Sequence, residues 1–363
     1  MEVNKLTRVC LGDVACECKE TCKEDKTGYP IVGLEHLHPG DLTLSEWDTE
    51  TETTFTKMFR KGSILFGRRR AYLKKAAVAP FDGICSGDIT VIKAIEERIV
   101  PELLPFIIQN DAFFEFAVGK SAGSLSPRVK WEHLKTYEFE LPSLEKQREL
   151  AELLWAIDDT KKSYQKLLVA TDELVKSQFI EIIRTAKSED KLLNHVDVLY
   201  GFPFNSKLFN TDKKGTPLLR IRDINSGLSD TYTTEIADNQ YVVYNGDCVV
   251  GMDGCFEITK WKHGKAYLNQ RVCKLTPIDI QKEFMIYYLM LKLKEIESVA
   301  SRTTVKHLSA KDINNMTIPI VDSKLQKWFE VFSLQSDKSK FELKQTLSEL
   351  EALSRKIVAD YLS

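Results

Sequence analysis

Residues 141–150 read LPSLEKQREL and begin a long region without helix breakers. Pro142 disfavours helix at the residue before it and Ser143 is a good N-cap, so a helix is expected to start at Leu144. From Ser143 to Tyr200 the chain has neither proline nor glycine. Apolar residues follow the three-and-four spacing of heptads at Leu150, Leu154, Ile157, Leu168, Val175 and Ile182. This pattern predicts a coiled-coil arm of about 60 Å.

A second helical run of similar length closes the chain. Its apolar residues are Phe329, Phe332, Leu343, Leu347, Leu350, Leu353, Ile357 and Tyr361. The polar break at 335–340 would lie opposite Lys161, where the first run is also weak. Two runs of one length, joined by a globule, most simply pair antiparallel. The alternative is that each run packs on its own globule.

The two halves of the chain repeat one order of short motifs. The segment 28–34 recurs as 215–221, 61–67 as 245–251, and 123–130 as 302–309. We therefore expect an α+β fold in which two globular domains, related by a pseudo-two-fold axis, are separated by two long antiparallel coiled-coil helices. The expected boundaries are 1–143 and 187–322 for the globular domains, and 144–186 and 323–363 for the helices.

Bulk composition is that of a folded protein with proper cores. The chain has 363 residues, of which 43% are hydrophobic, so two or three domains are expected and extensive disorder is not. No apolar run approaches the length needed to span a bilayer, and the N-terminus lacks a signal-peptide pattern. Eight irregularly spaced cysteines do not form a secreted disulfide framework. We expect a cytoplasmic protein without a membrane partner.

Several catalytic signatures are missing from the sequence. No two glycines are separated by a single residue, so no GxGxxG loop is present for a dinucleotide or for S-adenosylmethionine. No two prolines are adjacent, which excludes the Pro-Pro motif of amino-methyltransferases. The chain is therefore expected to be a binder rather than an enzyme, with no catalytic residues and no cofactor of its own.

Two weak patterns for metal chemistry remain. Asp13, Glu17 and Lys19 form a loose nuclease-like arrangement of acids and a lysine, which leaves a metal-dependent nuclease as one alternative function. The cysteines at 16, 18 and 22 lie near two histidines, but their spacing is not that of a zinc finger. We expect reduced structural cysteines and no metal site.

Basic side chains gather after strand-like runs and just before each helical run. In the first half they are Arg68, Arg69, Arg70, Lys74, Lys75, Arg128 and Lys130. In the second half the candidate set is Lys260, Trp261, Lys262, His263, Lys265, Arg271, Arg302, Lys306 and His307. Such residues can grip phosphates or reach guanine edges bidentately. We expect the basic loops after 62–67 and 246–251 to occupy the same structural position. The alternative is a set of solvated surface loops.

The junction between globule and helix resembles a known family. The segment 123–129, followed by Leu134 and by 139–148, is similar to the place where recognition domains meet helices in specificity subunits of type I restriction–modification enzymes. The segment 172–181 is similar to the end of that family's central helix, and 304–313 with 318–319 resembles the same junction in the second half. The second junction departs from the pattern, since 320–326 reads IVDSKLQ instead of LPSLEKQ.

The resemblance implies a non-catalytic DNA sequence-specificity subunit. Residues 1–143 and 187–322 would be target-recognition domains, each reading one half-site of a bipartite double-stranded DNA target. Two modification subunits, which methylate adenine with S-adenosylmethionine, and restriction subunits, which use ATP and Mg²⁺, would be partners. Leu153, Trp155, Trp328 and Phe329 would form a docking face or, alternatively, the interior of the coil. A protein–protein scaffold with two peptide-binding globules is the other alternative function.

Overall fold

The computed structural model describes residues 6–22, 26–49, 53–254, 256–300 and 306–362. Internal contacts divide the chain into two compact units, and each long helix contributes to both. Unit 1 comprises Met1–Leu167 with Leu343–Ser363, and unit 2 comprises Leu168–Glu342. Among the described residues, no helix is both long and apolar enough to cross a membrane.

Unit 1 contains three small sheets. In the first sheet the strand order is β2 (Ala15–Glu17), β8 (Ile89–Ala94), β5 (Ile64–Gly67) and β6 (Ala76–Val78). In the second sheet it is β3 (Ile31–Val32), β7 (Gly83–Cys85) and β4 (Lys57–Phe59). The third sheet pairs β1 (Thr7–Cys10) with β9 (Glu138–Leu141). Its short helices are α1 (Leu11–Val14), α2 (Leu104–Ile108), α3 (Asp111–Gly119) and α4 (Trp131–Leu134), with 3-10 turns η1 (Leu34–His36) and η2 (Ala71–Leu73). Burial of β5 along its whole length makes the first sheet the centre of the unit.

Unit 2 repeats this plan with additions. In its first sheet the strand order is β11 (Val196–Tyr200), β19 (Val272–Pro277), β16 (Cys248–Gly251) and β17 (Ile258–Lys260). In the second sheet it is β12 (Phe209–Asn210), β14 (Tyr232–Thr233), β13 (Thr216–Leu219), β18 (Ala266–Leu268) and β15 (Val242–Val243). The third sheet pairs β10 (Glu189–Lys191) with β20 (Thr317–Pro319). Its shorter helices are α6 (Asp223–Ser226), α7 (Lys282–Ala300) and α8 (Ala310–Asn314), with 3-10 turns η3 (Leu192–Asn194), η4 (Ser206–Leu208) and η5 (Asn239–Tyr241).

Strand register confirms the internal repeat. Gly67 pairs with Ile89 in unit 1, and Gly251 pairs with Val272 in unit 2, so β5 corresponds to β16 and β8 to β19. The parallel pairs β3·β7 and β13·β18 correspond in the same way. Unit 2 adds β12 and β14 beside β13. The mixed α+β class expected from the sequence is therefore confirmed.

The two long helices expected from the sequence are present as α5 (Leu144–Arg184) and α9 (Ser323–Tyr361). In unit 1, Lys146 lies over the ring of Tyr361 and Lys161 pairs with Glu351 at 4.0 Å, so the helices run antiparallel. Their apolar faces share one core with the globule; it includes Leu150, Leu154, Ile157, Ile357, Val358, Phe106 and Phe139. The helices therefore pack on each other and on the globule at once.

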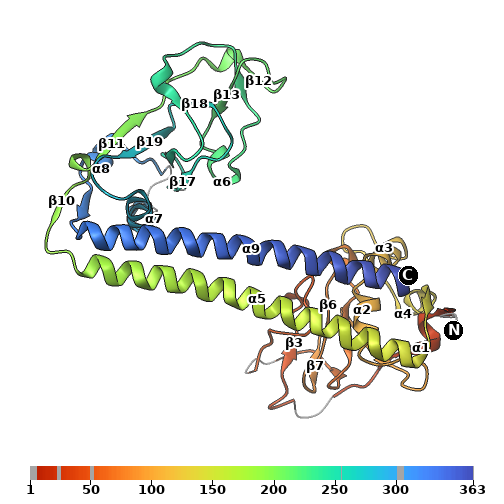
Figure 1. Ribbon diagram of the computed structural model, residues 1–363. Helices are drawn as coiled ribbons and strands as arrows, with labels where there is room; N and C mark the ends of the chain where they lie inside the picture. Colours follow the sequence, from red (N-terminus) through yellow and green to blue (C-terminus); the bar gives the residue numbers. More distant parts are fainter. Residues whose placement is uncertain (1–5, 23–25, 50–52, 255, 301–305, 363) are drawn as a thin grey trace, which may run out of the picture. The chain divides into compact units, whose positions relative to one another are not determined.

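In unit 2 the other parts of the same helices are paired in the same sense. Phe179 contacts Phe329 at 5.0 Å between ring centroids, and Lys340 pairs with Asp172 at 2.8 Å. Helix α7 joins this core through Phe284 and Tyr287, beside the first turns of α9 (Figure 1). The expected antiparallel coiled-coil pairing is thus present within each unit.

Candidate nucleic-acid interface

In unit 1, three of the basic residues expected at the interface surround one carboxylate, and we call Arg68, Arg69, Arg128 and Asp88 the Asp88 cluster. Arg128 donates from Nε to Asp88 Oδ1 at 2.6 Å and from Nη2 to Oδ2 at 3.1 Å. Arg69 Nη1 lies 3.5 Å from Asp88 Oδ2, and its Nη2 donates to Ser126 Oγ. These hydrogen bonds, led by Arg128, hold the pKa of Asp88 below its ordinary value despite partial burial.

The backbone of this cluster is fixed where β5 ends. Arg68 donates its N–H to the carbonyl of Asp88 and accepts from the N–H of Val129. Arg70 donates its N–H to the carbonyl of Pro127, so the segment 127–129 runs beside 68–70. The Nε atoms of Arg68 and Arg69 are buried and have no hydrogen-bond partner in the part of the chain that the structure describes. The cluster holds three guanidinium groups against one carboxylate and is strongly cationic.

Besides Arg70, three other expected residues of unit 1 lie outside the cluster. Lys74 pairs with Asp111 at the start of α3, and Lys75 donates to the carbonyl of Leu34 at 2.6 Å. Lys130 is exposed at the N-cap position of α4. Lys75 is therefore engaged within the fold, whereas Lys130 offers its ammonium to solvent.

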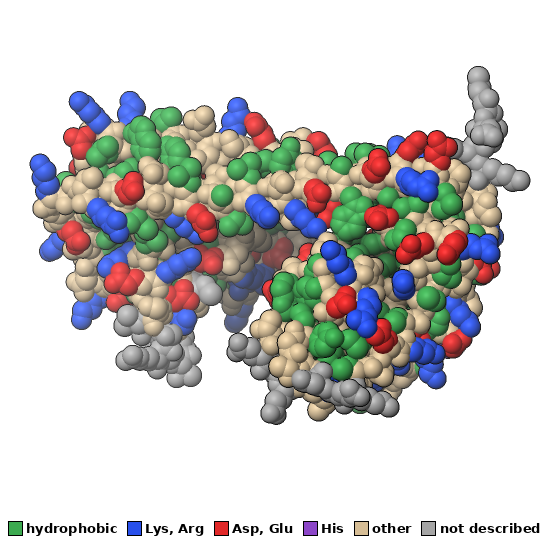
Figure 2. Space-filling view, turned by 90° about the horizontal axis from the view of Figure 1, so that it is seen from below, with side chains coloured by type: hydrophobic (Ala, Val, Ile, Leu, Met, Phe, Trp, Pro, Cys, Tyr) green, Lys and Arg blue, Asp and Glu red, His purple; other side chains and the backbone are tan. Residues whose placement is uncertain are grey.

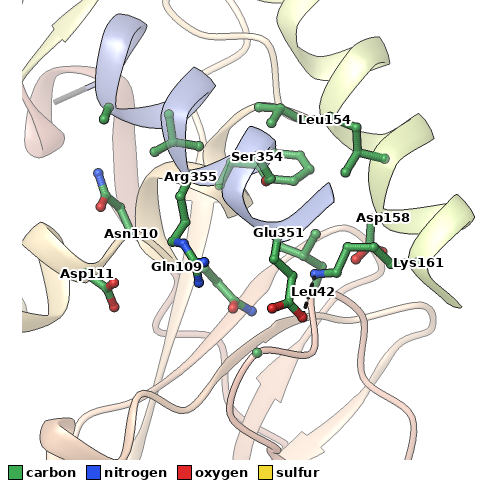
Figure 3. Close-up of a pocket in the computed structure, with 15 residues that line it drawn as sticks. Leu42, Gln109, Asn110, Asp111, Leu154, Asp158, Lys161, Glu351, Ser354 and Arg355 are labelled. Atoms are coloured by element: carbon green, nitrogen blue, oxygen red, sulfur yellow. Dashed lines mark ion pairs between the residues drawn. The ribbon is translucent and has the colours of Figure 1, made fainter. Parts of the chain in front are cut away.

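A cavity of about 500 Å³ in unit 1 is lined by α5, α9 and the turn between α2 and α3. Figure 3 shows Lys161 and Glu351 directed toward one another across it. Asp158 is 6% exposed and pairs with Lys162, so its charge is neutralised on its own helix. Asp111, the partner of Lys74, also lines the cavity. Mixed charges of this kind belong to a packing seam between the helices and the globule.

In unit 2 the corresponding place holds a second carboxylate between two basic side chains. Asp253 Oδ2 lies 3.0 Å from Arg271 Nη1, and its Oδ1 lies 2.5 Å from His307 Nδ1. We call Asp253, Arg271 and His307 the Asp253 cluster. Lys306 beside it pairs with Glu297 at 3.0 Å. A smaller cavity of about 140 Å³ opens next to Asp253, with Arg222 in its lining.

The two clusters occupy equivalent backbone positions. Met252 donates to the carbonyl of Arg271, Leu308 donates to the carbonyl of Met252, and Gly254 donates to the carbonyl of Lys306. These three bonds repeat those of Arg68, Val129 and Arg70 in unit 1. Isolated bridges also correspond, since Arg69 faces Arg128 and Asp253 faces His307. Arg69 is therefore equivalent to Asp253, Asp88 to Arg271, and Arg128 to His307.

This equivalence shows that one expectation was wrong. The basic stretch 260–265 does not correspond to Arg68–Arg70, because Cys248 pairs with Lys260 just as Ile64 pairs with Val78. Lys260 ends β17, the next strand, where its ammonium is held by both carboxylate oxygens of Glu283 at 2.9 and 3.0 Å. The segment equivalent to Arg68–Arg70 is 252–254.

Within that stretch, Trp261 must be removed from the candidate contacts. Its ring is only 1% exposed and packs in the core, and its Nε1 donates to the carbonyl of Gly264 at 2.8 Å. A buried ring has no face to offer a base or sugar. Lys262, His263 and Lys265 are exposed and remain predicted contacts. Arg302 lies outside the described residues.

Charge is dispersed over the surface beyond the clusters. Figure 2 shows lysine and arginine side chains interspersed with aspartate and glutamate across the face that it presents. Recognition based on such a surface depends on local groups rather than on one broad basic field.

Comparison with known proteins identifies the family. The model of the type I restriction modification DNA specificity domain matches residues 4–169 and 199–351, which together make up most of the chain. The chain belongs to this family. Its repeat of sheet and strand-end cluster is therefore a pair of specificity domains within one polypeptide.

Two curated relatives from Escherichia coli match parts of the chain. The type I restriction enzyme EcoBI specificity subunit is 36% identical over 172 residues, covering 45% of this chain and 36% of the relative. The EcoDI specificity subunit is 25% identical over 198 residues, covering 53% and 44%. Each match thus spans less than half the length of the relative.

Two solved structures share the fold over nearly the whole chain. One is a chain from a study of complex assembly and conformational transition of the type I restriction–modification system, with a TM-score of 0.63, 19% identity, and coverage of 98% and 96%. The other is the type I restriction–modification S subunit from M. genitalium, with a TM-score of 0.61, 14% identity, and coverage of 99% and 96%. At these identities the likeness concerns the fold.

Sequence reasoning about this specificity-domain chain missed the carboxylates at the centres of both clusters. Asp88 and Asp253 are isolated acids in the sequence, and only strand pairing brings them to the basic residues. The sequence repeat that makes β5 equivalent to β16 was the one signal for these carboxylates, because it also makes the partner strands β8 and β19 equivalent. Arg222 was also missed, since 217–224 reads simply as a strand.

The residues of the nuclease alternative have local structural roles in this specificity-domain fold. Asp13 Oδ2 accepts from the N–H of Cys10, and Glu17 pairs with Lys57 at 3.5 Å and with Lys19 at 3.8 Å. Across the described residues, no group of three or more histidine, cysteine or acidic side chains is placed to hold a metal. Family membership does not favour the nuclease or the peptide-binding scaffold.

The helices of the chain expose several large apolar side chains. Leu153 and Trp328 are 47% and 48% exposed, whereas Phe329 is fully buried in the core of unit 2. Trp155 is half-buried and donates from Nε1 to the carbonyl of Glu102. Of the residues considered for docking, only Leu153 and Trp328 lie substantially in solvent, and α9 adds Leu325, Val331, Leu334 and Phe341 to this exposed set.

Proposed function

We propose that this chain is the DNA sequence-specificity subunit of a type I restriction–modification complex. Each unit would contact one half of a bipartite double-stranded DNA target through the strand-end cluster and the exposed basic residues near it. The observation that carries this proposal is the repeat itself: one polypeptide builds the same sheet twice and places cationic side chains at the same strand ends. Its site of action would be the cytoplasm.

The energetics of specific DNA binding favour two recognition units over one. Specific DNA binding typically exceeds non-specific binding by about 4–10 kcal/mol. One bidentate base contact contributes about 1–3 kcal/mol. With two or three such contacts each, one unit contributes about 2–9 kcal/mol and two units together about 4–18 kcal/mol, so only the pair reaches this range when each contact is weak. Because both units belong to one chain, binding of the second unit to DNA is intramolecular once the first unit is bound.

Partners would supply the chemistry. We infer that two modification subunits dock on the exposed apolar residues of α5 and α9, among them Leu153 and Trp328. Restriction subunits would join that complex. S-adenosylmethionine, ATP and Mg²⁺ would then be held by the partners. Support comes from the apolar exposure of the helices, because groups of exposed large apolar side chains mark interaction surfaces.

The direct test is a footprint of the chain assembled with its modification subunits. Two protected segments separated by an unprotected spacer are expected on a duplex that carries the methylated motif. The chain alone is expected to bind no S-adenosylmethionine by calorimetry. Absence of sequence-dependent protection, with the complex intact by light scattering, would contradict the proposal and favour a protein scaffold.

A further inference from the structure

Both clusters place one carboxylate between two basic side chains, but they build this arrangement from different positions. In unit 1 the acid precedes β8, as Asp88, and in unit 2 it follows β16, as Asp253. Every one of the three equivalent positions has changed residue type between the units. The arrangement of an acid between two basic side chains is nevertheless present in both.

The hydrogen bonds of Arg128 leave one edge of its guanidinium free. Nε and Nη2 both face Asp88, so the Nη1 hydrogens and the outer Nη2 hydrogen point away from the carboxylate. The side chain is 42% exposed. Two parallel N–H groups on such an edge match O6 and N7 of guanine in the major groove. Arg271 is 52% exposed and its Nη1 lies 3.0 Å from Asp253 Oδ2, and a single ion pair with one carboxylate does not use all five N–H donors of a guanidinium.

A carboxylate has a cost on a surface that binds DNA, because it repels phosphates. A surface that needed only electrostatic attraction would gain affinity by losing Asp88 and Asp253. Both side chains are about three-quarters buried, with exposures of 21% and 28%; Asp88 contacts two arginines, and Asp253 contacts Arg271 and His307. Fixing the direction of an arginine is the function that justifies this cost.

Resting on the function proposed above, we infer that Arg128 and Arg271 each read a guanine in the major groove, and that Asp88 and Asp253 are their positioning residues. Arg128 is equivalent to His307, whereas Arg271 is equivalent to Asp88. The two arginines therefore project from different backbone positions within otherwise similar units. The guanines that they read are then not related by two-fold symmetry, and the two half-sites differ.

The test uses the chain assembled with its modification subunits and a library of duplex DNA with randomised base pairs. Sequencing of bound DNA gives the base preference at every position. Asp88→Asn is expected to reduce discrimination for guanine at one position of one half-site by about ten- to a hundredfold. Asp253→Asn is expected to act in the same way on the other half-site alone. Affinity for non-specific duplex should rise in both variants, since a negative charge is lost.

Two matched controls remove carboxylates that hold cations elsewhere in the same units. Asp82→Asn breaks a contact with Arg60, and Asp279→Asn breaks one with His195. Both controls are expected to leave every base preference unchanged. Arg128→Lys provides a second variant that keeps the charge but loses the planar fork, and it should relax the same position as Asp88→Asn.

Replacement of the guanine at that position by 7-deazaguanine distinguishes loss of the base contact from loss of folding. It should weaken binding by the wild-type complex and have little further effect on Asp88→Asn. If Asp88→Asn and Arg128→Lys keep the wild-type base preferences, the inference is overturned while the proposed function stands. If the wild-type complex itself enriches no motif, the proposed function fails.

Discussion

At the scale of single residues, Arg70 has an unusual backbone conformation. Its φ is 54°, in the left-handed region, which costs a residue with a Cβ about 1 kcal/mol or more. Its equivalent in unit 2 is Gly254, with φ of 74°, which adopts this conformation without strain. Arg70 is exposed and donates its N–H to Pro127. The strain at Arg70 indicates that its side chain has a function, and DNA phosphate is the partner that we expect.

Replacement of Arg70 by glycine should therefore affect stability and binding differently. Arg70→Gly is expected to leave the free energy of unfolding unchanged or raise it by up to about 1 kcal/mol, measured by urea denaturation. DNA affinity should fall, and the slope of log affinity against log salt should decrease by about one. Arg70→Ala is the control: it should lose the same affinity without any gain in stability. Undiminished affinity in both variants would exclude a phosphate contact.

His195 gives a second prediction at this scale. Burial alone would lower its pKa, but its contacts with Asp279 at 2.7 Å and Asp190 at 3.2 Å outweigh burial and raise the pKa. A raised pKa in the folded state means that protonated His195 stabilises unit 2. This stabilisation is complete below the ordinary value of 6.5 and is lost as the pH rises through the folded pKa.

The loss of stability on His195→Gln should accordingly be larger at pH 5 than at pH 9. Urea denaturation of wild type and variant at both pH values measures the difference. An equal loss at both values would show that the two aspartates do not favour the imidazolium. His133→Gln, on the exposed surface of α4, is the matched histidine control.

At the scale of elements, the start of each long helix is anchored by a buried glutamine. Gln147 accepts from the N–H of Val100 at 2.9 Å and donates to the carbonyl of Pro142 at 2.8 Å. Gln326 accepts from the N–H of Gln281 and donates to the carbonyl of Val321 at corresponding distances of 3.0 and 2.9 Å. The two junctions differ in sequence around these residues, yet both keep the glutamine and its two bonds.

Loss of either glutamine should destabilise its own unit. Gln147→Ala leaves a backbone donor and a backbone acceptor unsatisfied in the core, at a cost of about 2–4 kcal/mol. Gln326→Ala should have an effect of similar size. Arg148→Ala is the matched control at an exposed position of the same helical turn and should change stability by less than about 1 kcal/mol. A cost for Gln147→Ala as small as the control would refute the anchoring role.

The elements also show what could be predicted from the sequence. Helices α5 and α9 and the repeat of β5 as β16 were predictable, because heptad spacing and strand motifs are local patterns. The position of the stretch 260–265 was not, because it depends on which residue β17 places opposite Cys248. The burial of Trp261 and the pairing of Lys260 with Glu283 follow from that register. The roles of Asp88 and Asp253 could not be predicted from local sequence either, because only strand pairing brings these carboxylates to their partners.

At the scale of the whole molecule, α5 and α9 are the only long continuous elements, among those described, that contribute to both units. The division between the units falls at Leu167 in α5 and at Leu343 in α9. Insertions at these two points would therefore lengthen the helices between the units without altering either core. One heptad adds about 10 Å to a helix, which is close to the rise of three base pairs.

Insertion of one heptad in both helices at these points should lengthen the unread DNA spacer by about three base pairs. Both half-sites should stay the same, because the clusters are untouched. Binding to duplexes with spacers of graded length, by the chain in complex with its modification subunits, measures the shift. An unchanged optimal spacer would contradict the idea that the paired helices set the distance. A heptad inserted in α5 alone is the control and should disrupt the pairing.

The backbone bonds that frame the two clusters have an evolutionary consequence. Arg68, Arg70 and Val129 are joined to their neighbours through main-chain atoms, as are Met252, Gly254 and Leu308. Such bonds tolerate almost any side chain at the positions between them. Mutations there can alter what is read while the scaffold keeps its stability. Each unit can thus acquire a new preference independently of the other.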